Sequence, residues 1–128
     1  MSSRQDRDAD SVALEVPGRP EYLRLVRLAA ADSGTRANLS IEEVEDLRIA
    51  VDELTYALIG NEATGGTLTL HYTATKGLVE IEGSCAAHGS AMVVSDLSRS
   101  IIGAVVDEYE VADRDGYRRF QLRKRSRL

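Results

Sequence analysis

The chain reads SIEEVEDLRIAVDELTYALIG from Ser40 to Gly60. Ser40 and Glu43 have the spacing of a capping box, in which a hydroxyl and a carboxylate satisfy backbone N–H groups of the first helical turn. Leu39 and Val44 are placed to form a hydrophobic staple, and Gly60 can adopt the left-handed conformation that ends a helix. The stretch therefore predicts an amphipathic helix whose apolar stripe comprises Val44, Leu47, Val51, Leu54 and Leu58.

The residues before this helix predict a leader, a strand and a further helix. Residues 1–10 are polar, charged and aperiodic, which is typical of a disordered leader, and residues 12–16 alternate as a strand does. A helix then starts at Pro20 and ends near Gly34. Its predicted outward residues are Arg24 and Arg27, and its predicted apolar face comprises Tyr22, Leu25, Val26, Leu28 and Ala29.

The second half of the chain is rich in predicted strands. Residues 68–72 and 79–82 alternate around a Lys76-Gly77 turn, and residues 109–112 and 117–122 pair around Asp115-Gly116. Between the two hairpins a helix is predicted from the helical spacing of Val94, Leu97, Ile101 and Val105. This order of elements predicts an α/β two-layer sandwich, a mostly antiparallel sheet with helices on one face.

Length and composition exclude several classes of protein. The 128 residues suit one domain, predicted over residues 11–128, and the single Cys85 excludes an internal disulfide. His71 and His88 lack neighbours at zinc-ligand spacing and are expected at the surface, while Cys85 is expected to be an inert thiol. We find no apolar run long enough to cross a membrane and no signal-peptide core, so we expect a cytoplasmic protein without a membrane partner.

Charge is unevenly distributed along the chain. The net charge of -5 argues against binding to polyanions, although six basic residues crowd residues 118–127 and acidic residues crowd 42–53. The favoured interpretation of both runs is a solvated face. Tyr117 and Phe120 fall on opposite faces of a strand, so base stacking is not expected, and direct nucleic-acid binding is disfavoured.

Residues 16–59, and above all Ile49-Ala50-Val51-Asp52-Glu53-Leu54, resemble the RsbW-type anti-sigma factors. That family consists of serine-protein kinases with the histidine-kinase-like ATPase (Bergerat-type) fold, and residues 101–110 look like its last helix running into its final hairpin. The resemblance implies a partner-switching protein. It would hold a sigma factor, be released by a STAS-type anti-anti-sigma protein, and form a homodimer.

In the resembled family the nucleotide site depends on residues that are largely absent from this chain. Glu53 matches the catalytic base, but Ala57 stands where an asparagine ligates magnesium, and alanine offers no side-chain oxygen. No aspartate follows the strand over 79–81, where Ser84 lies, and Ser98-Arg99 replaces the glycine-leucine pair that admits phosphates to a helix N-terminus. The predicted lid, residues 89–93, is also short. We therefore expect no cofactor and negligible binding of Mg-ATP.

The residues leave three functions open. The favoured one is an anti-sigma factor that binds protein through exposed Arg24 and Arg27, with a solvated basic face as the alternative. The second is an active serine-protein kinase that uses Mg-ATP and Glu53 to phosphorylate its antagonist. Glu53 is then a base with a raised pKa, whereas in the first case it is a structural carboxylate, which we favour. The third, a nucleic-acid contact through the basic end, is the weakest.

Overall fold

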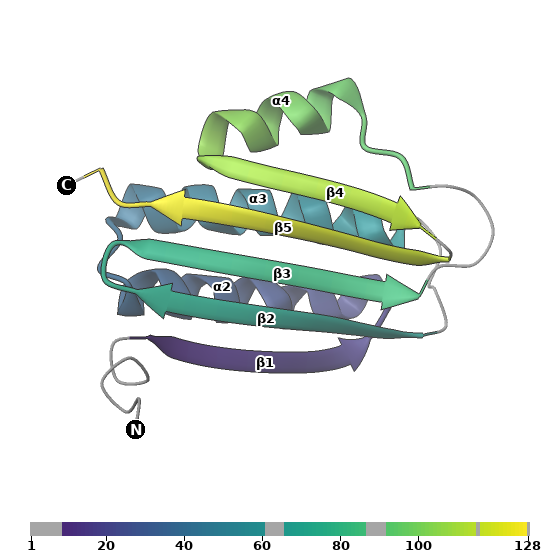
Figure 1. Ribbon diagram of the computed structural model, residues 1–128, viewed down its shortest axis with the longest axis horizontal. Helices are drawn as coiled ribbons and strands as arrows, with labels where there is room; N and C mark the ends of the chain where they lie inside the picture. Colours follow the sequence, from purple (N-terminus) through teal and green to yellow (C-terminus); the bar gives the residue numbers. More distant parts are fainter. Residues whose placement is uncertain (1–8, 61–65, 87–91, 115, 128) are drawn as a thin grey trace.

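The described part of the computed structural model, residues 9–60, 66–86, 92–114 and 116–127, forms one antiparallel five-stranded sheet with its helices on one face (Figure 1). The strand order is β1-β2-β3-β5-β4. The predicted two-layer α/β sandwich is confirmed. The elements are β1 (Asp10–Pro17), the 3-10 helix η1 (Pro20–Tyr22), α2 (Leu23–Arg36), α3 (Ile41–Ile59), β2 (Thr67–Thr75), β3 (Leu78–Ala86), α4 (Asp96–Val105), β4 (Glu108–Arg114) and β5 (Tyr117–Arg125).

Several predictions concern residues that lie outside the described ranges. They are residues 1–8 of the predicted leader, His88, residues 89–91 of the predicted lid and Asp115 of the last turn. Asp10, the last residue of the predicted leader, instead pairs with Ala74 as the first residue of β1. None of the described helices is long and apolar enough to cross a membrane.

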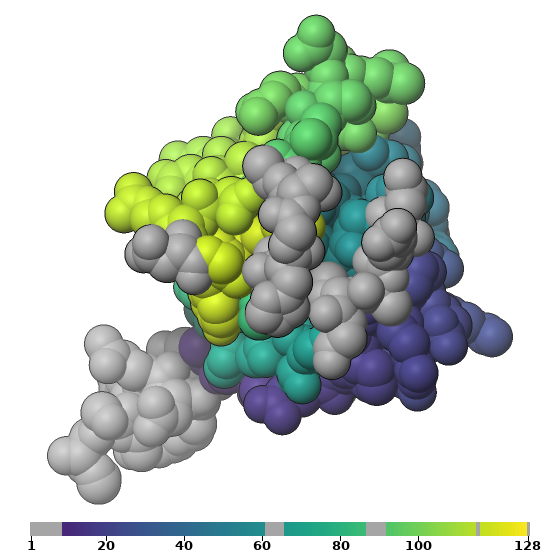
Figure 2. All heavy atoms as spheres, turned by 90° about the vertical axis from the view of Figure 1, so that its right-hand side faces the viewer, coloured from purple at the N-terminus to yellow at the C-terminus, as the bar shows by residue number. Residues whose placement is uncertain are grey.

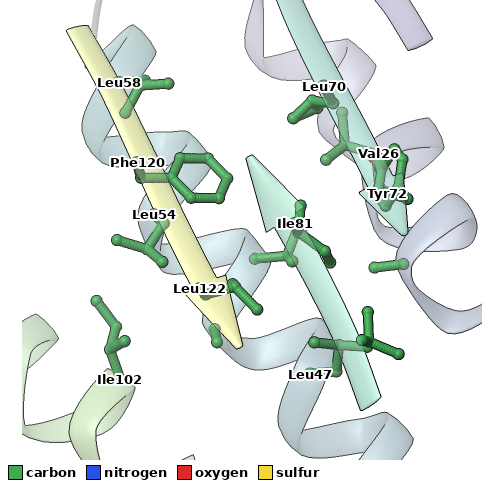
Figure 3. Packing of buried hydrophobic residues seen from close by; sticks show 14 of the residues in the cluster. Val26, Leu47, Leu54, Leu58, Leu70, Tyr72, Ile81, Ile102, Phe120 and Leu122 are labelled. Atoms are coloured by element: carbon green, nitrogen blue, oxygen red, sulfur yellow. The ribbon is translucent and has the colours of Figure 1, made fainter. Parts of the chain in front are cut away.

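The core lies between the sheet and the helix pair α2 and α3 (Figure 3). Alternate residues of the strands face the helices, as the period of a strand requires. Tyr72 is fully buried among them, and its hydroxyl donates a hydrogen bond of 3.1 Å to the backbone oxygen of Val26 in α2. Burial raises the pKa of Tyr72, so the phenol stays neutral. Fully buried aliphatic and aromatic residues from both layers include Leu47, Leu54, Leu58, Leu68, Leu70, Ile81, Phe120 and Leu122.

Helix α3 begins and ends where the sequence predicts. The Ser40 hydroxyl accepts a hydrogen bond of 3.1 Å from the N–H of Glu43, and the Glu43 carboxylate accepts one of 2.8 Å from the N–H of Ser40. Gly60 has a φ of 71°, a conformation that glycine adopts without steric cost. The capping box and the glycine stop are therefore confirmed.

The predicted buried face of α2 is only partly right. Val26 is fully buried as predicted, but Leu25 and Leu28 are 44% and 56% exposed, and the core side of the helix also carries Ala30 and Gly34. Small residues on this side let α2 approach α3 closely: a Cβ atom on Gly34 would lie 2.9 Å from Cγ2 of Val44. Tight packing of the two helices thus decides which stripe is buried.

In α4 the predicted stripe is also partly wrong. Leu97 is 71% exposed, and Ile102 is the described residue of this helix that is fully buried. Helix α4 packs on α3 and β4 rather than across the sheet, so a narrower stripe is covered.

Two cations of the basic C-terminal run are buried rather than part of a solvated face, whereas Arg119, Arg125 and Arg127 are exposed as predicted. Arg118 is buried, and its Nη1 donates a hydrogen bond of 3.0 Å to the carbonyl of Leu58 in the last turn of α3. Lys124 is buried too, and its Nζ donates to the carbonyl of Val105 in the last turn of α4, at 2.7 Å. Cations at these positions complement the partial negative charge of a helix C-terminus.

The end of the chain is tied to the start of α3. The second oxygen of the Glu43 carboxylate accepts a hydrogen bond of 2.8 Å from the backbone N–H of Arg127. The N–H groups of Ser40 and Arg127, in that order of importance, lower the pKa of the Glu43 carboxyl from its ordinary value of 4.5.

Glu43→Gln should therefore cost stability in a pH-dependent way. Because the folded pKa is below 4.5, the extra stability is complete above that value and is lost as the pH falls through the lowered folded pKa. We expect the loss in unfolding free energy, measured by urea denaturation, to be about 1 kcal/mol near pH 7 and to shrink toward pH 3. Glu42→Gln in the same turn is the control. A loss that is constant with pH would contradict this account.

Two glycine substitutions should have opposite effects. A Cβ atom on Gly83 in β3 would lie 2.8 Å from Cζ of the buried Phe120 and 3.1 Å from Cδ2 of Leu70, so Gly83→Ala should lower the unfolding free energy by about 2 kcal/mol. At Gly103 in α4 a Cβ atom would meet none of the described atoms within 4 Å, so Gly103→Ala should raise it by up to about 1 kcal/mol. Thermal unfolding of both variants would show equal shifts if the contact with Phe120 were unimportant.

Candidate functional site

Two of the predicted nucleotide-site residues, Glu53 and Ser98, are brought together between α3 and α4. The Ser98 hydroxyl donates a hydrogen bond of 2.7 Å to Oε1 of Glu53. At the other end of α4, Lys124 donates to Asp46 of α3 at 3.3 Å as well as to the carbonyl of Val105. These ties hold α4 antiparallel to α3, and Figure 2 shows α4 at the top of the molecule, above the strands β4 and β5 on one side and α3 on the other.

The first turn of α4 forms a short relay of hydroxyl groups. Ser95 is the N-cap, and its hydroxyl accepts a hydrogen bond of 3.0 Å from the N–H of Ser98. The same hydroxyl donates to the Ser98 hydroxyl at 3.1 Å, and Ser98 donates in turn to Glu53. The N–H and the hydroxyl of Ser98, and the carboxylate of Glu53, are thus already engaged in hydrogen bonds within the protein.

The remaining predicted nucleotide positions on the helices are Ala57 and Arg99. Ala57 lies one turn after Glu53 on the same flank of α3, half-buried and without a side-chain oxygen to offer. Arg99 is exposed in α4. Among the described residues there is no group of three or more His, Cys, Asp or Glu side chains that could hold a metal ion.

Ser84 is not part of this site. It lies on the face of β3 that points away from the helices, where its hydroxyl accepts a hydrogen bond of 3.3 Å from the Tyr117 hydroxyl. The neighbours Gly83 and Cys85 are the residues of β3 that face the helices, because side chains alternate along a strand. The assignment of Ser84 to the nucleotide region is therefore corrected.

Arg27 is not the exposed group that the sequence predicts. Its Nη1 lies 2.7 Å from Oδ1 of Asp52 in α3, and both side chains are partly buried. Arg24 is exposed as predicted, and beside it on the outer face of α2 lie Leu25 and Leu28. We call Arg24, Leu25 and Leu28 the α2 surface.

Sequence reasoning missed two features of these sites. The Ser95 cap could have been found, because a serine followed by an acidic residue, Asp96, is a common start of a helix. The apolar part of the α2 surface could not have been found, because the helix carries leucines on two sides and only packing decides which side is buried.

No protein-family model matches the chain. It is 35% identical over 77 residues to the serine-protein kinase RsbW of Listeria monocytogenes, covering 56% of this chain and 48% of that protein. It is 32% identical over 107 residues to the anti-sigma-F factor RsbW of Mycobacterium tuberculosis, covering 83% of this chain and 64% of that protein.

The sequence is RsbW-like. It spans about half the length of the first RsbW proteins that it matches. A crystal structure of the RsbU and RsbW domains of a Mycobacterium tuberculosis protein matches 91% of this chain and 32% of that one, with a TM-score of 0.68 and 14% identity. The predicted family fold is confirmed.

The other candidate groups of this RsbW-like chain show no reactive arrangement. His71 is exposed on the open face of the sheet. Cys85 is buried, its thiol lies 3.6 Å from the carbonyl of Leu58, and burial raises its pKa, which disfavours the reactive thiolate.

Proposed function

We propose that this RsbW-like chain is an anti-sigma factor that binds a sigma factor and releases it when a STAS-type anti-anti-sigma protein competes. The α2 surface is the observation that carries the proposal. It presents one arginine and two leucines on the outer side of a helix whose inner side is packed on the core. A cytoplasmic location is part of this proposal.

The chemistry of the α2 surface suits an acidic partner with an apolar centre. Arginine pairs with carboxylates through two parallel hydrogen bonds, and it is enriched where interfaces derive most of their energy. Leu25 and Leu28 add apolar area around Arg24 that water would leave on binding. The pair of Arg27 and Asp52 stands beside this surface and holds α2 on α3.

Reversal of charge at Arg24 tests this surface. In affinity capture from the native cell followed by mass spectrometry, Arg24→Glu and Leu28→Asp should each lower the recovery of sigma-factor peptides by about tenfold or more. Arg99→Glu reverses an exposed arginine on α4 and should leave recovery unchanged. A further variant combines Arg27→Glu with Asp52→Arg, which reverses the charge at residue 27 and keeps the ion pair between the two positions. Unchanged capture by the Arg24 and Leu28 variants would place the interface on another surface. Absence of any sigma factor from the wild-type capture would contradict the proposed anti-sigma function.

We also propose that nucleotide binding has been lost. The support is the absence of an oxygen ligand at Ala57 together with the hydrogen bonds that already engage Ser98 and Glu53. The alternative is the serine-protein kinase, for which Glu53 would have to leave Ser98 and act as a base.

Titration calorimetry with Mg-ATP separates these two functions. We expect no heat of binding at millimolar nucleotide, and no added phosphate on a STAS-type antagonist when its intact mass is measured after incubation with ATP. Micromolar affinity would contradict the loss of binding. A phosphate that disappears with Glu53→Gln would establish the kinase.

Two further parts of the proposal concern assembly. A homodimer stays a prediction, supported by the exposed edge strand β1, where Val12 is 42% exposed. A protein partner is favoured over nucleic acid, since Phe120 is buried, Lys124 is bound internally, and Arg123 lies 3.1 Å from Glu80 and 3.2 Å from Glu108.

A further inference from the structure

A groove lies where the end of α4 meets the start of β4. Strand β4 forms the edge of the sheet opposite β1 (Figure 1). The volume of the groove is about 590 Å³. We call it the β4 groove. It is lined by Gly103 of α4, by Val106 and Asp107 between α4 and β4, by residues 108–110 of β4, and by residues 121–123 of β5.

Along the β4 groove, apolar and acidic side chains are separated by face. Tyr109 pairs with Leu122 and belongs to the side of the sheet that faces the helices. Glu108 and Glu110 pair with Arg123 and Gln121 and belong to the open side. Since β4 is the outermost strand, a further strand laid beside it would present its own side chains alternately to these two surroundings.

The charge of the β4 groove is negative. Asp107, Glu108 and Glu110 contribute three carboxylates, and Arg123 is the one cation among the described lining residues. That guanidinium is shared between Glu108, at 3.2 Å, and Glu80, at 3.1 Å. A positively charged side chain on the open side would therefore be attracted.

The groove has room at Gly103. This residue is exposed, and a Cβ atom there would meet none of the described atoms within 4 Å. Val106 and Tyr109, half-buried against the core, supply apolar surface nearby. An apolar side chain directed to the helix side would find space and apolar contacts together.

We propose that the β4 groove binds an extended segment of a partner protein that adds to β4 as another strand and alternates apolar residues with lysine or arginine. Backbone hydrogen bonds to the outer edge of β4 give affinity, and the alternation gives specificity. The apolar residues of the segment face Gly103, Val106 and Tyr109, and its basic residues face Glu108 and Glu110. This inference does not depend on the proposed sigma-factor function.

Charged residues on an edge strand can also serve to repel other strands. Under that alternative Glu108 and Glu110 protect β4 against pairing, and no extended peptide binds, whatever its charge.

Fluorescence anisotropy with two labelled synthetic peptides decides between these roles. The basic probe is Thr-Val-Lys-Val-Lys-Val-Thr, and the acidic probe replaces both lysines by glutamate. The full chain should bind the basic probe, and the backbone amide signals of residues 107–111 should shift in its NMR spectrum. Equal binding of both probes, absence of binding, or shifts confined to other strands would overturn the proposal.

Substitutions at Gly103 test whether the groove itself is used. Gly103→Met places a helix-compatible side chain in the open space and should weaken binding of the basic probe by about tenfold or more. Gly103→Ala is the matched control and should bind as the wild type does. Binding by the methionine variant at wild-type affinity would exclude the groove.

Charge reversal at Glu110 tests the electrostatic part. Glu110→Lys should weaken binding of the basic probe by about fivefold or more and lessen the preference over the acidic probe. Glu15→Lys makes the same change in net charge on β1, at the opposite edge, and should have little effect. Equal effects of the two reversals would show attraction to the overall charge rather than to the β4 groove.

Discussion

The placement of α3 against the centre of the sheet is the constraint on which the rest of the structure depends, and β5 fixes both ends of that helix. Arg118 of β5 donates to the carbonyl of Leu58 near the C-terminus of α3, and the N–H of Arg127, just after β5, donates to Glu43 at its N-terminus. Burying the guanidinium of Arg118 would be costly without such an acceptor. The polar ties therefore define one position of α3, while the apolar contacts beneath it supply most of the stability.

Once α3 is fixed, α4 uses atoms that a nucleotide would need, which supports the proposed loss of nucleotide binding. The carboxylate of Glu53 and the hydroxyl and N–H of Ser98 would each be useful to a phosphate or a metal-bound water. Here the Ser98 hydroxyl ties α4 to Glu53, the N–H of Ser98 is bonded to Ser95, and Lys124 secures the other end of α4. A ligand would have to displace these intramolecular hydrogen bonds, and the cost of doing so reduces its affinity. Stability of the α3–α4 pair and nucleotide chemistry are alternatives in this arrangement.

Features that depend on interactions between residues close in sequence could be predicted, whereas features that depend on contacts between distant residues required the structure. The ends of α3 were predicted because the capping box and Gly60 are local signals. The face of α2 was predicted only in part, because Leu25 and Leu28 fit an apolar stripe beside Val26 as well as Leu23 does until Gly34 meets Val44 of another helix. Likewise, the positions of Glu53 and Ser98 followed from a resemblance, but their hydrogen bond joins residues far apart in the chain and required the structure.

The two edges of the sheet give the molecule two chemically different ends. At one edge β1 exposes Val12, and α2, which packs on β2 and β1, exposes Leu25, Leu28 and Arg24, whereas β4 at the other edge carries carboxylates around a groove. In the order β1-β2-β3-β5-β4 four inter-strand spacings separate these edges, which amounts to about 19 Å. That distance exceeds the Debye length of about 8 Å at physiological ionic strength, so charges at one edge are largely screened from the other. A basic segment at β4 and an acidic partner at α2 would therefore neither compete for the same surface nor neutralise each other's binding site.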